Sequence, residues 1–172
     1  ESNFEAGTNA EWTSETDTGS LLDFPHVSML AGVSGQGPMA PFRGAYCARW
    51  TLSGTADASL TSTTIDIADA ATSWFRWYLY LATDFAFTAD DTISIFKLTQ
   101  AGGGTVEYTV GLELDVDDGS ILLGGSDGTA AVAFGTTNVT RGKWHAIEVR
   151  ATVSSAGAGV ITTYLDGAQQ TT

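Results

Sequence analysis

The chain has little positive charge and no long apolar run. Its 172 residues carry 7 basic and 20 acidic side chains, a formal net charge of −13. A nucleic-acid phosphate backbone requires a basic patch, so this balance argues against nucleic-acid binding. The same charge disfavours docking on an anionic membrane, and no run of 18 apolar residues is present to span one. We therefore expect neither a nucleic-acid partner nor membrane insertion.

Cysteine is also scarce, because Cys47 is the only one and cannot form an internal disulfide. It lies in an apolar segment with strand-like alternation, which favours a small buried side chain over a reactive thiol. A chain of this length can bury roughly 70% of its unfolded surface, so a core can form without disulfides or metal. The 43% apolar residues and five tryptophans indicate a folded chain.

Apolar and polar residues alternate with a period of two along much of the chain, and the 3.6-residue spacing of apolar residues that is typical of a helix is nearly absent. In the segment 73–81, Phe75, Trp77 and Leu79 fall on one face. Asp-Gly dipeptides, typical of tight hairpins, separate several of the later segments. Roughly eight to ten short strands at this spacing predict an all-β, antiparallel β-sandwich with little or no helix. The predicted strands are residues 45–52, 61–67, 73–81, 92–98, 105–116, 120–123, 130–134, 144–153 and 160–165, with short ones at 4–5 and 10–13.

One long irregular stretch, residues 23–44, interrupts the alternation. It holds all three prolines, Pro25, Pro38 and Pro41, and several glycines. Loops of this length are uncommon in a compact domain and are often functional. Two interpretations stay open: a crossover between the two sheets, and a loop that contacts a ligand or a partner subunit.

The segment 142–167, GKWHAIEVRATVSSAGAGVITTYLDG, has a tryptophan followed by alternating apolar residues, then an apolar residue, tyrosine, leucine and an Asp-Gly turn. The opening residues 3–7, NFEAG, and the hairpin-like run 108–123 fit the same pattern. On these motifs the chain resembles the concanavalin A-like or laminin-G-like jelly-roll superfamily. The resemblance implies a single jelly-roll domain over residues 1–172. It also implies closing strands after the Asp-Gly turn, which we expect to be shortened, missing or supplied by another chain.

Residues between the apolar positions carry rings and charges that suit a sugar ligand. Aromatic faces stack on sugar rings, while arginine and carboxylate groups hydrogen-bond to hydroxyls. Members of the resembled superfamily hold sugars on the concave sheet, so the resemblance implies carbohydrate binding there. The alternative is cross-strand pairing of arginines with carboxylates on a solvated sheet. The candidate ligand-binding residues are Trp74, Arg76, Tyr78, Tyr80, Glu113 and Arg150.

Carboxylates cluster between residues 113 and 118. Alternation puts Glu113, Asp115 and Asp117 on one strand face, and the run resembles the catalytic E-x-D-x-(x)-E strand of glycoside hydrolase family 16 glucanases. That resemblance implies a nucleophile, an assisting acid and a general acid/base, although the last residue is Asp rather than Glu. A second hypothesis is a calcium site at Asp115, Asp117 and Asp118, since calcium prefers oxygen ligands. Turn formation explains the same aspartates without a metal.

The preferred interpretation is a non-catalytic recognition or attachment module that binds carbohydrate, on an extracellular or virion surface. Its partner is then a glycan or a surface protein, and its one candidate cofactor is calcium. The first alternative is a structural virion protein, a capsid decoration or tail-fibre component that forms homo-oligomers or a capsid lattice. Its support is the Thr-, Ala- and Gly-rich, Lys-poor composition. The second alternative is a family 16-like glucanase.

Overall fold

The computed structural model describes residues 12, 14–20, 22–24, 47–51, 58–61, 67–85, 92–99, 107–115, 117–126, 133–154 and 159–171. The loop predicted at 23–44 and the short strands predicted at 4–5 and 10–13 lie almost wholly outside these residues. The described residues form strands and turns, and none of them belongs to a helix that could cross a membrane. The chain divides into two compact units, Glu1–Asp66 and Ile67–Thr172.

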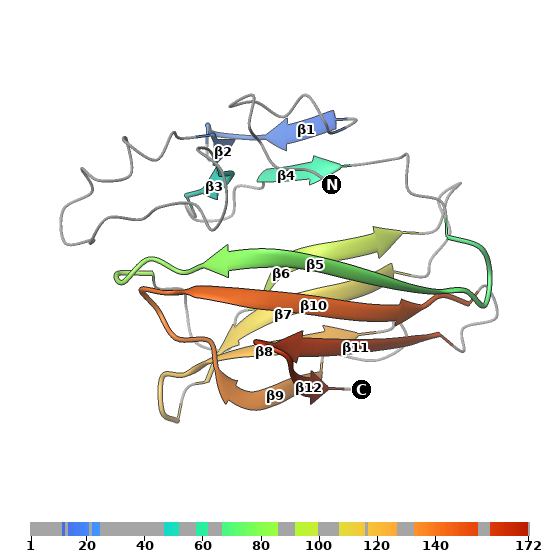
Figure 1. Cartoon of the computed structure of the whole chain (residues 1–172). Helices are drawn as coiled ribbons and strands as arrows, with labels where there is room; N and C mark the ends of the chain where they lie inside the picture. The colour runs from blue at the N-terminus through green and yellow to red at the C-terminus, as the bar shows by residue number, and fades with distance from the viewer. Residues whose placement is uncertain are drawn as a thin grey trace. The chain divides into compact units, whose positions relative to one another are not determined.

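The first unit contains two small antiparallel strand pairs (Figure 1). β1 (Ser14–Asp17) pairs with β4 (Ala58–Thr61), and β2 (Leu22–Asp23) pairs with β3 (Arg49–Trp50). Arg49 Nε donates to Asp23 Oδ1 at 2.9 Å, and this hydrogen bond raises the pKa of the Arg49 guanidinium. Cys47 is half-buried next to β3, and burial raises the pKa of its thiol, so it stays neutral.

The second unit is a sandwich of two four-stranded antiparallel sheets packed together, which confirms the predicted fold class. One sheet has the order β12-β11-β10-β5 and the other β6-β7-β8-β9 (Figure 1). The strands of the first sheet are β5 (Thr72–Tyr80), β10 (Trp144–Thr152), β11 (Val160–Leu165) and β12 (Ala168–Thr171). Those of the second are β6 (Thr92–Thr99), β7 (Glu107–Leu114), β8 (Ile121–Ser126) and β9 (Ala133–Asn138).

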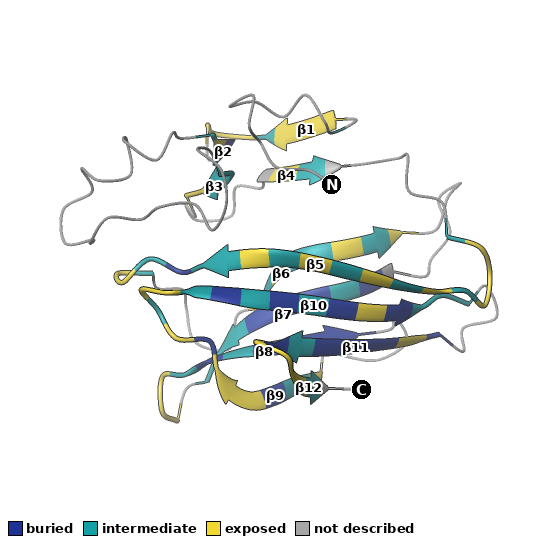
Figure 2. Ribbon diagram, in the orientation of Figure 1, coloured by how far each residue is buried: buried dark blue, intermediate teal, exposed yellow. Residues whose placement is uncertain are grey.

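Burial follows the predicted alternation along these strands. On β10, Ile147 and Val149 are fully buried, while Arg150 is exposed. On β5, Trp74 and Arg76 are exposed and the residue between them is half-buried. Figure 2 shows the resulting bands along both strands. A strand places successive side chains on opposite faces, so each strand contributes one face to the core and one to the outside.

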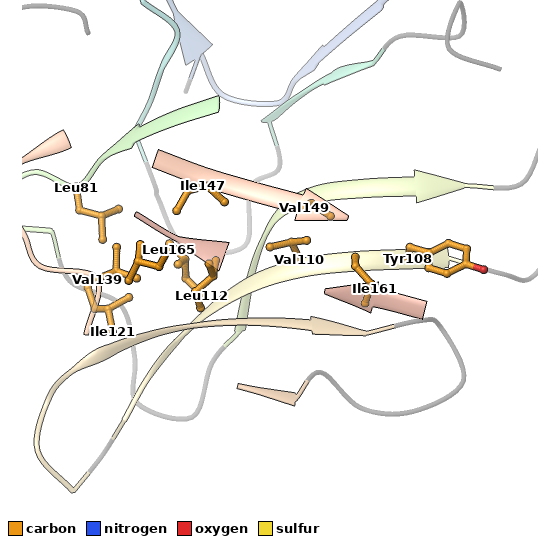
Figure 3. Close-up of a cluster of buried hydrophobic side chains, with 11 residues drawn as sticks. Leu81, Tyr108, Val110, Leu112, Ile121, Val139, Ile147, Val149, Ile161 and Leu165 are labelled. Carbon is orange, nitrogen blue, oxygen red and sulfur yellow. The ribbon is translucent and has the colours of Figure 1, made fainter. Parts of the chain in front are cut away.

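The core lies between the two sheets, where apolar side chains from both meet (Figure 3). Ile147 and Val149 come from one sheet, and Val110 and Leu112 from the other. Burying one such side chain stabilises the fold by about 1.5–3 kcal/mol. The buried cluster consists of Leu81, Tyr108, Val110, Leu112, Ile121, Leu123, Val139, Ile147, Val149, Ile161 and Leu165.

The chain continues beyond the Asp166-Gly167 turn into β12, a short strand that the alternation did not predict. β12 pairs with β11, with a register shift between Thr163 and Tyr164. It also contacts β9 of the other sheet. A Cβ on Gly135 would lie 2.6 Å from Gln170 Oε1 and 3.2 Å from its Cα, so the glycine permits this close approach.

Candidate functional site

The residues of β5, β10 and β11 that point away from the core form one surface rich in aromatic rings and arginine. Phe75, Ile147 and Leu165 pack in or against the core, so the alternate positions on these strands lie outside. The antiparallel register places these outward residues in rows across the sheet. We call this surface the aromatic face. Its large and charged side chains are Trp74, Arg76, Tyr78, Tyr80, Trp144, Glu148, Arg150 and Tyr164.

Two aromatic pairs lie toward the two ends of the aromatic face. The ring centroids of Trp74 and Tyr164 are 5.6 Å apart, and those of Tyr80 and Trp144 are 5.4 Å apart. Because β10 runs between β5 and β11, the Trp74 and Tyr164 rings approach each other across β10. Residues 74 and 80 are separated by about 20 Å along β5, at roughly 3.3 Å per residue. The two pairs therefore bracket an extended stretch of sheet.

The two arginines of the aromatic face differ in what they contact. Arg76 Nε donates to Glu148 Oε1 at 2.8 Å, and its Nη2 donates to the same oxygen. Arg150, one row further along β10, is exposed and has neither a side-chain hydrogen bond nor an ion pair within the described chain. Its cross-strand neighbours are Trp74 and Thr162. Arg150 therefore keeps its five N–H donors for an external acceptor.

Thr162 lies opposite Arg150 and is buried although alternation turns it away from the core. It is 2% exposed, and its Oγ1 has no hydrogen-bond partner within the described part of the chain. A buried polar group without a partner costs about 1–3 kcal/mol. A water molecule or a polar ligand atom reaching this row would remove that cost.

Five of the six predicted ligand-binding residues share the aromatic face. They are Trp74, Arg76, Tyr78, Tyr80 and Arg150. The sixth, Glu113, lies on β7 in the other sheet, so the structure separates it from the other five.

The prediction omitted Trp144, Glu148 and Tyr164. Trp144 and Glu148 alternate with His145 and Ile147 along β10, and this pattern was a signal that could have added them.

The predicted catalytic strand of Glu113, Asp115 and Asp117 does not form as a strand. β7 ends one residue after Glu113, and both aspartates lie in the turn that leads to β8. There Asp117 N donates to Asp115 Oδ1 at 2.9 Å. The hydroxyl and the backbone N–H of Ser120 donate to Asp118 and hold the pKa of Asp118 below its ordinary value. These carboxylates act as turn-forming groups, so alternation does not align them with Glu113.

The calcium hypothesis concerns Asp115, Asp117 and Asp118. Within the described ranges, no three His, Cys, Asp or Glu side chains are grouped to hold a metal ion. Hydrogen bonds within the turn account for one carboxylate oxygen each of Asp115 and Asp118. Calcium binding at this turn stays a prediction.

His145 is a buried histidine with both ring nitrogens in hydrogen-bond contact. It is 1% exposed; its Nδ1 lies 2.8 Å from Asp166 Oδ2 and its Nε2 lies 3.0 Å from the Thr140 carbonyl oxygen. Ala146 N donates to the other Asp166 oxygen. Burial raises the pKa of Asp166, but the hydrogen bonds from Ala146 and His145 outweigh it, so this pKa lies below its ordinary value. The contact ties the β11–β12 turn to β10.

An antiparallel sandwich with an exposed aromatic and arginine surface has the features of a carbohydrate-binding protein. The sequence model of the polysaccharide lyase family matches residues 42–172, which is more than half of the chain. The chain therefore belongs to the polysaccharide lyase family, a family of the concanavalin A-like, jelly-roll type, and its function is related to carbohydrate. No curated protein and no solved structure is significantly similar to the chain.

The family match corrects the preference for a non-catalytic module. A lyase is an enzyme, so the prediction that the protein is not an enzyme is wrong. The prediction failed because one sandwich fold carries binding modules as well as enzymes, and alternation reports the fold rather than the chemistry. A cell-surface or virion setting stays a prediction.

Proposed function

We propose that the protein cleaves an acidic polysaccharide by elimination and binds it along the aromatic face. The match to the polysaccharide lyase family over residues 42–172 carries this proposal. A lyase breaks the glycosidic C–O bond without water. A base takes the proton from the carbon next to the sugar carboxylate, the electrons of that C–H bond form a C=C bond, and the linked sugar oxygen leaves and takes up a proton to become a hydroxyl. The substrate is therefore a polysaccharide that contains uronate rings, such as a polyuronate, because this reaction needs a carboxyl group next to the carbon that loses its proton.

The aromatic face supplies the residue types that this substrate needs. Trp74 and Tyr78 are 60% and 36% exposed, so their rings are open to stacking on sugar. Arginine stabilises the ring carboxylate and the negative charge that develops on it as the proton leaves. Tyrosine hydroxyls on the same face are groups that can donate or accept a proton.

Incubation of the whole chain with a panel of polysaccharides tests this function. We expect at least one polyuronate to be shortened, with an unsaturated sugar at each new end. That end is detected by a rise in ultraviolet absorbance and by a product mass one water lower than that of a hydrolysis product. A neutral glucan of similar length is the control and should stay intact. Saturated products would indicate a hydrolase instead, and no cleavage of any polyuronate would contradict the proposal.

A further inference from the structure

We propose that Arg150 selects a sugar ring that bears a carboxylate, within a subsite formed with Trp74, Thr162 and Tyr164. This group of four residues is named the Arg150 subsite. The inference rests on the proposed function for the class of ligand, and it adds which side chain distinguishes an acidic ring from a neutral one.

Arg76 is paired with Glu148, whereas Arg150 has no side-chain partner among the residues that the structure describes. Arg76 makes two hydrogen bonds to Glu148, whose side chain is only 19% exposed. If Arg76 turned to a ligand, it would first have to give up both hydrogen bonds to that carboxylate. Arg150 has no partner to give up within the described residues. Its planar guanidinium matches a carboxylate with two parallel hydrogen bonds.

Arg150 lies beside an aromatic platform formed by Trp74 and Tyr164. Trp74 is directly opposite Arg150, and directly opposite residues have Cβ atoms about 4.5–5.5 Å apart. Tyr164 is one row away on β11, and its ring lies 5.6 Å from that of Trp74. A sugar ring stacked on Trp74 therefore has its substituents within reach of the Arg150 guanidinium. A ring carboxylate gains an ion pair with two hydrogen bonds there, whereas an ester gains only hydrogen bonding from the guanidinium, without the attraction between opposite charges.

The hydroxyl group of Thr162 belongs to the same cross-strand row as Arg150. It lies opposite Arg150, is buried, and has no hydrogen-bond partner within the described chain. Native proteins pair the great majority of such groups with protein or with ordered water. A polar ligand, or a water that it fixes, would complete the pairing. This observation is independent of the charge of Arg150, and it adds a polar atom that lacks a partner to the same cross-strand row.

Binding measured separately from cleavage tests the inference. The probes are trisaccharides of galacturonate, glucuronate and mannuronate, each as the free acid and as the methyl ester, titrated into the whole chain by calorimetry. We expect at least one acid to bind tenfold or more tightly than its ester. Arg150→Gln should abolish this difference, and Arg150→Lys should retain part of it. Trp74→Ala should weaken acid and ester by a similar factor, because stacking does not depend on the carboxylate.

Lys97→Gln is the matched control, since it removes the same charge from an exposed position on β6 of the other sheet. It should leave the preference for the acid unchanged. Circular dichroism of each variant confirms that it folds. Equal affinity for acid and ester, no binding of any acid, or a preference that survives Arg150→Gln would each overturn the inference.

The same variants separate the inference from the proposed function. Selective binding that depends on Arg150 without any unsaturated product would keep the subsite and refute the lyase. Cleavage of a polyuronate with the same kcat and KM in Arg150→Gln would keep the lyase and refute the subsite.

Discussion

Arg76 and Arg150 are two residues of one type on one face of a sheet, yet only one is available to a ligand. What separates them is Glu148, which lies opposite Arg76 and pairs with it across 72 positions of sequence. Alternation along β5 and β10 predicts that both arginines point outward. It does not predict the register between the two strands, so the partner of Arg76 became visible only in the structure.

Asp166 offers a test at the residue scale, because it receives hydrogen bonds from Ala146 and the buried His145. Its pKa is lower in the folded protein than in the unfolded chain, so its ionised form adds stability above the ordinary pKa of an aspartate. That stability is lost as the pH falls through the folded-state pKa. We expect Asp166→Asn to lower the free energy of unfolding by about 1 kcal/mol at pH 7. The loss should shrink toward pH 3, as measured by urea unfolding.

Asparagine suits this test because it tolerates the positive φ of 50° at position 166 and so keeps the turn. Asp117→Asn is the control, since Asp117 is an exposed turn residue and the charge change is the same. Equal losses of stability in the two variants would show that the contact with His145 contributes nothing.

Among the elements, β5, β10 and β11 are predicted best. The expected segments 73–81, 144–153 and 160–165 agree with the observed strands to within one residue at each end. Their bulky apolar residues alternate strongly, so local sequence is sufficient. β12 has the sequence AQQT and β1 has SETD, without such alternation. β1 forms because β4, far along the chain, pairs with it. β12 forms because the Asp166-Gly167 turn folds it back on β11 and because it contacts β9 of the other sheet, and local alternation reports neither.

Local alternation also does not report which sheet a strand joins, and for this reason Glu113 was wrongly grouped with the residues of the aromatic face. β5 and β6 are consecutive strands, but β5 pairs with β10 while β6 and β7 belong to the other sheet. Which sheet a strand joins is decided by pairing and core packing over the whole unit. Alternation assigned Glu113 correctly to an outward position, and the structure shows that this position faces the other side of the sandwich.

Gly159 supplies a prediction at the element scale, where the start of β11 packs against β7. A Cβ at this position would lie 2.6 Å from Tyr108 Cζ and 2.8 Å from the Thr152 carbonyl oxygen. A buried ring and backbone cannot both move away, and overpacking of this kind typically costs about 1–3 kcal/mol. We expect Gly159→Ala to lower the free energy of unfolding by that amount in urea titrations.

Tyr108→Phe is the companion variant for this contact. It removes only the hydroxyl that accepts a hydrogen bond from Ser154 N at 2.9 Å, so we expect a loss of about 1 kcal/mol. Combining the two changes should rescue Gly159→Ala only in part, because the hydroxyl, the nearest atom, is removed while Tyr108 Cζ and the Thr152 carbonyl oxygen remain. A Gly159→Ala variant as stable as the parent would contradict the packing described.

At the scale of the whole molecule, the sequence pattern predicted the fold class correctly but did not predict that the protein is an enzyme. The Asp-Gly turns and alternating segments specify an antiparallel sandwich by local chemistry alone. Trp74, Tyr78 and Arg150 are residue types that hold a sugar whether or not it is then cleaved. These residues therefore do not distinguish a binding module from an enzyme. The distinction comes from the similarity of residues 42–172 to the polysaccharide lyase family.

The net charge of −13 gives a prediction for the binding of a polyuronate. Protein and ligand then repel each other at long range, while the Arg150 contact attracts at short range. Salt shortens the Debye length from about 30 Å at 0.01 M to about 8 Å at 0.15 M, so it suppresses the repulsion more than the contact. We expect the affinity for a long polyuronate to rise severalfold over this range, as measured by calorimetry in a sodium chloride series.

The methyl ester of the same polymer is the control for this prediction. It carries no charge, so its affinity should change little with salt. A steady fall in the affinity of the acid form over the same range would show that local attraction outweighs the net charge.

The pairing of β5 with β10 also has a consequence for synthesis. β5 ends at residue 80 and β10 begins at residue 144, so 144 − 80 = 64 positions of chain separate them. At about 5–20 residues per second, a ribosome needs roughly 3–13 s to reach β10. Until then the strand TSWFRWYLY, rich in aromatic residues, lacks its partner and has the composition of an aggregation-prone segment. Arg76, its only charged residue, interrupts that segment and so protects the nascent chain before Glu148 has been made.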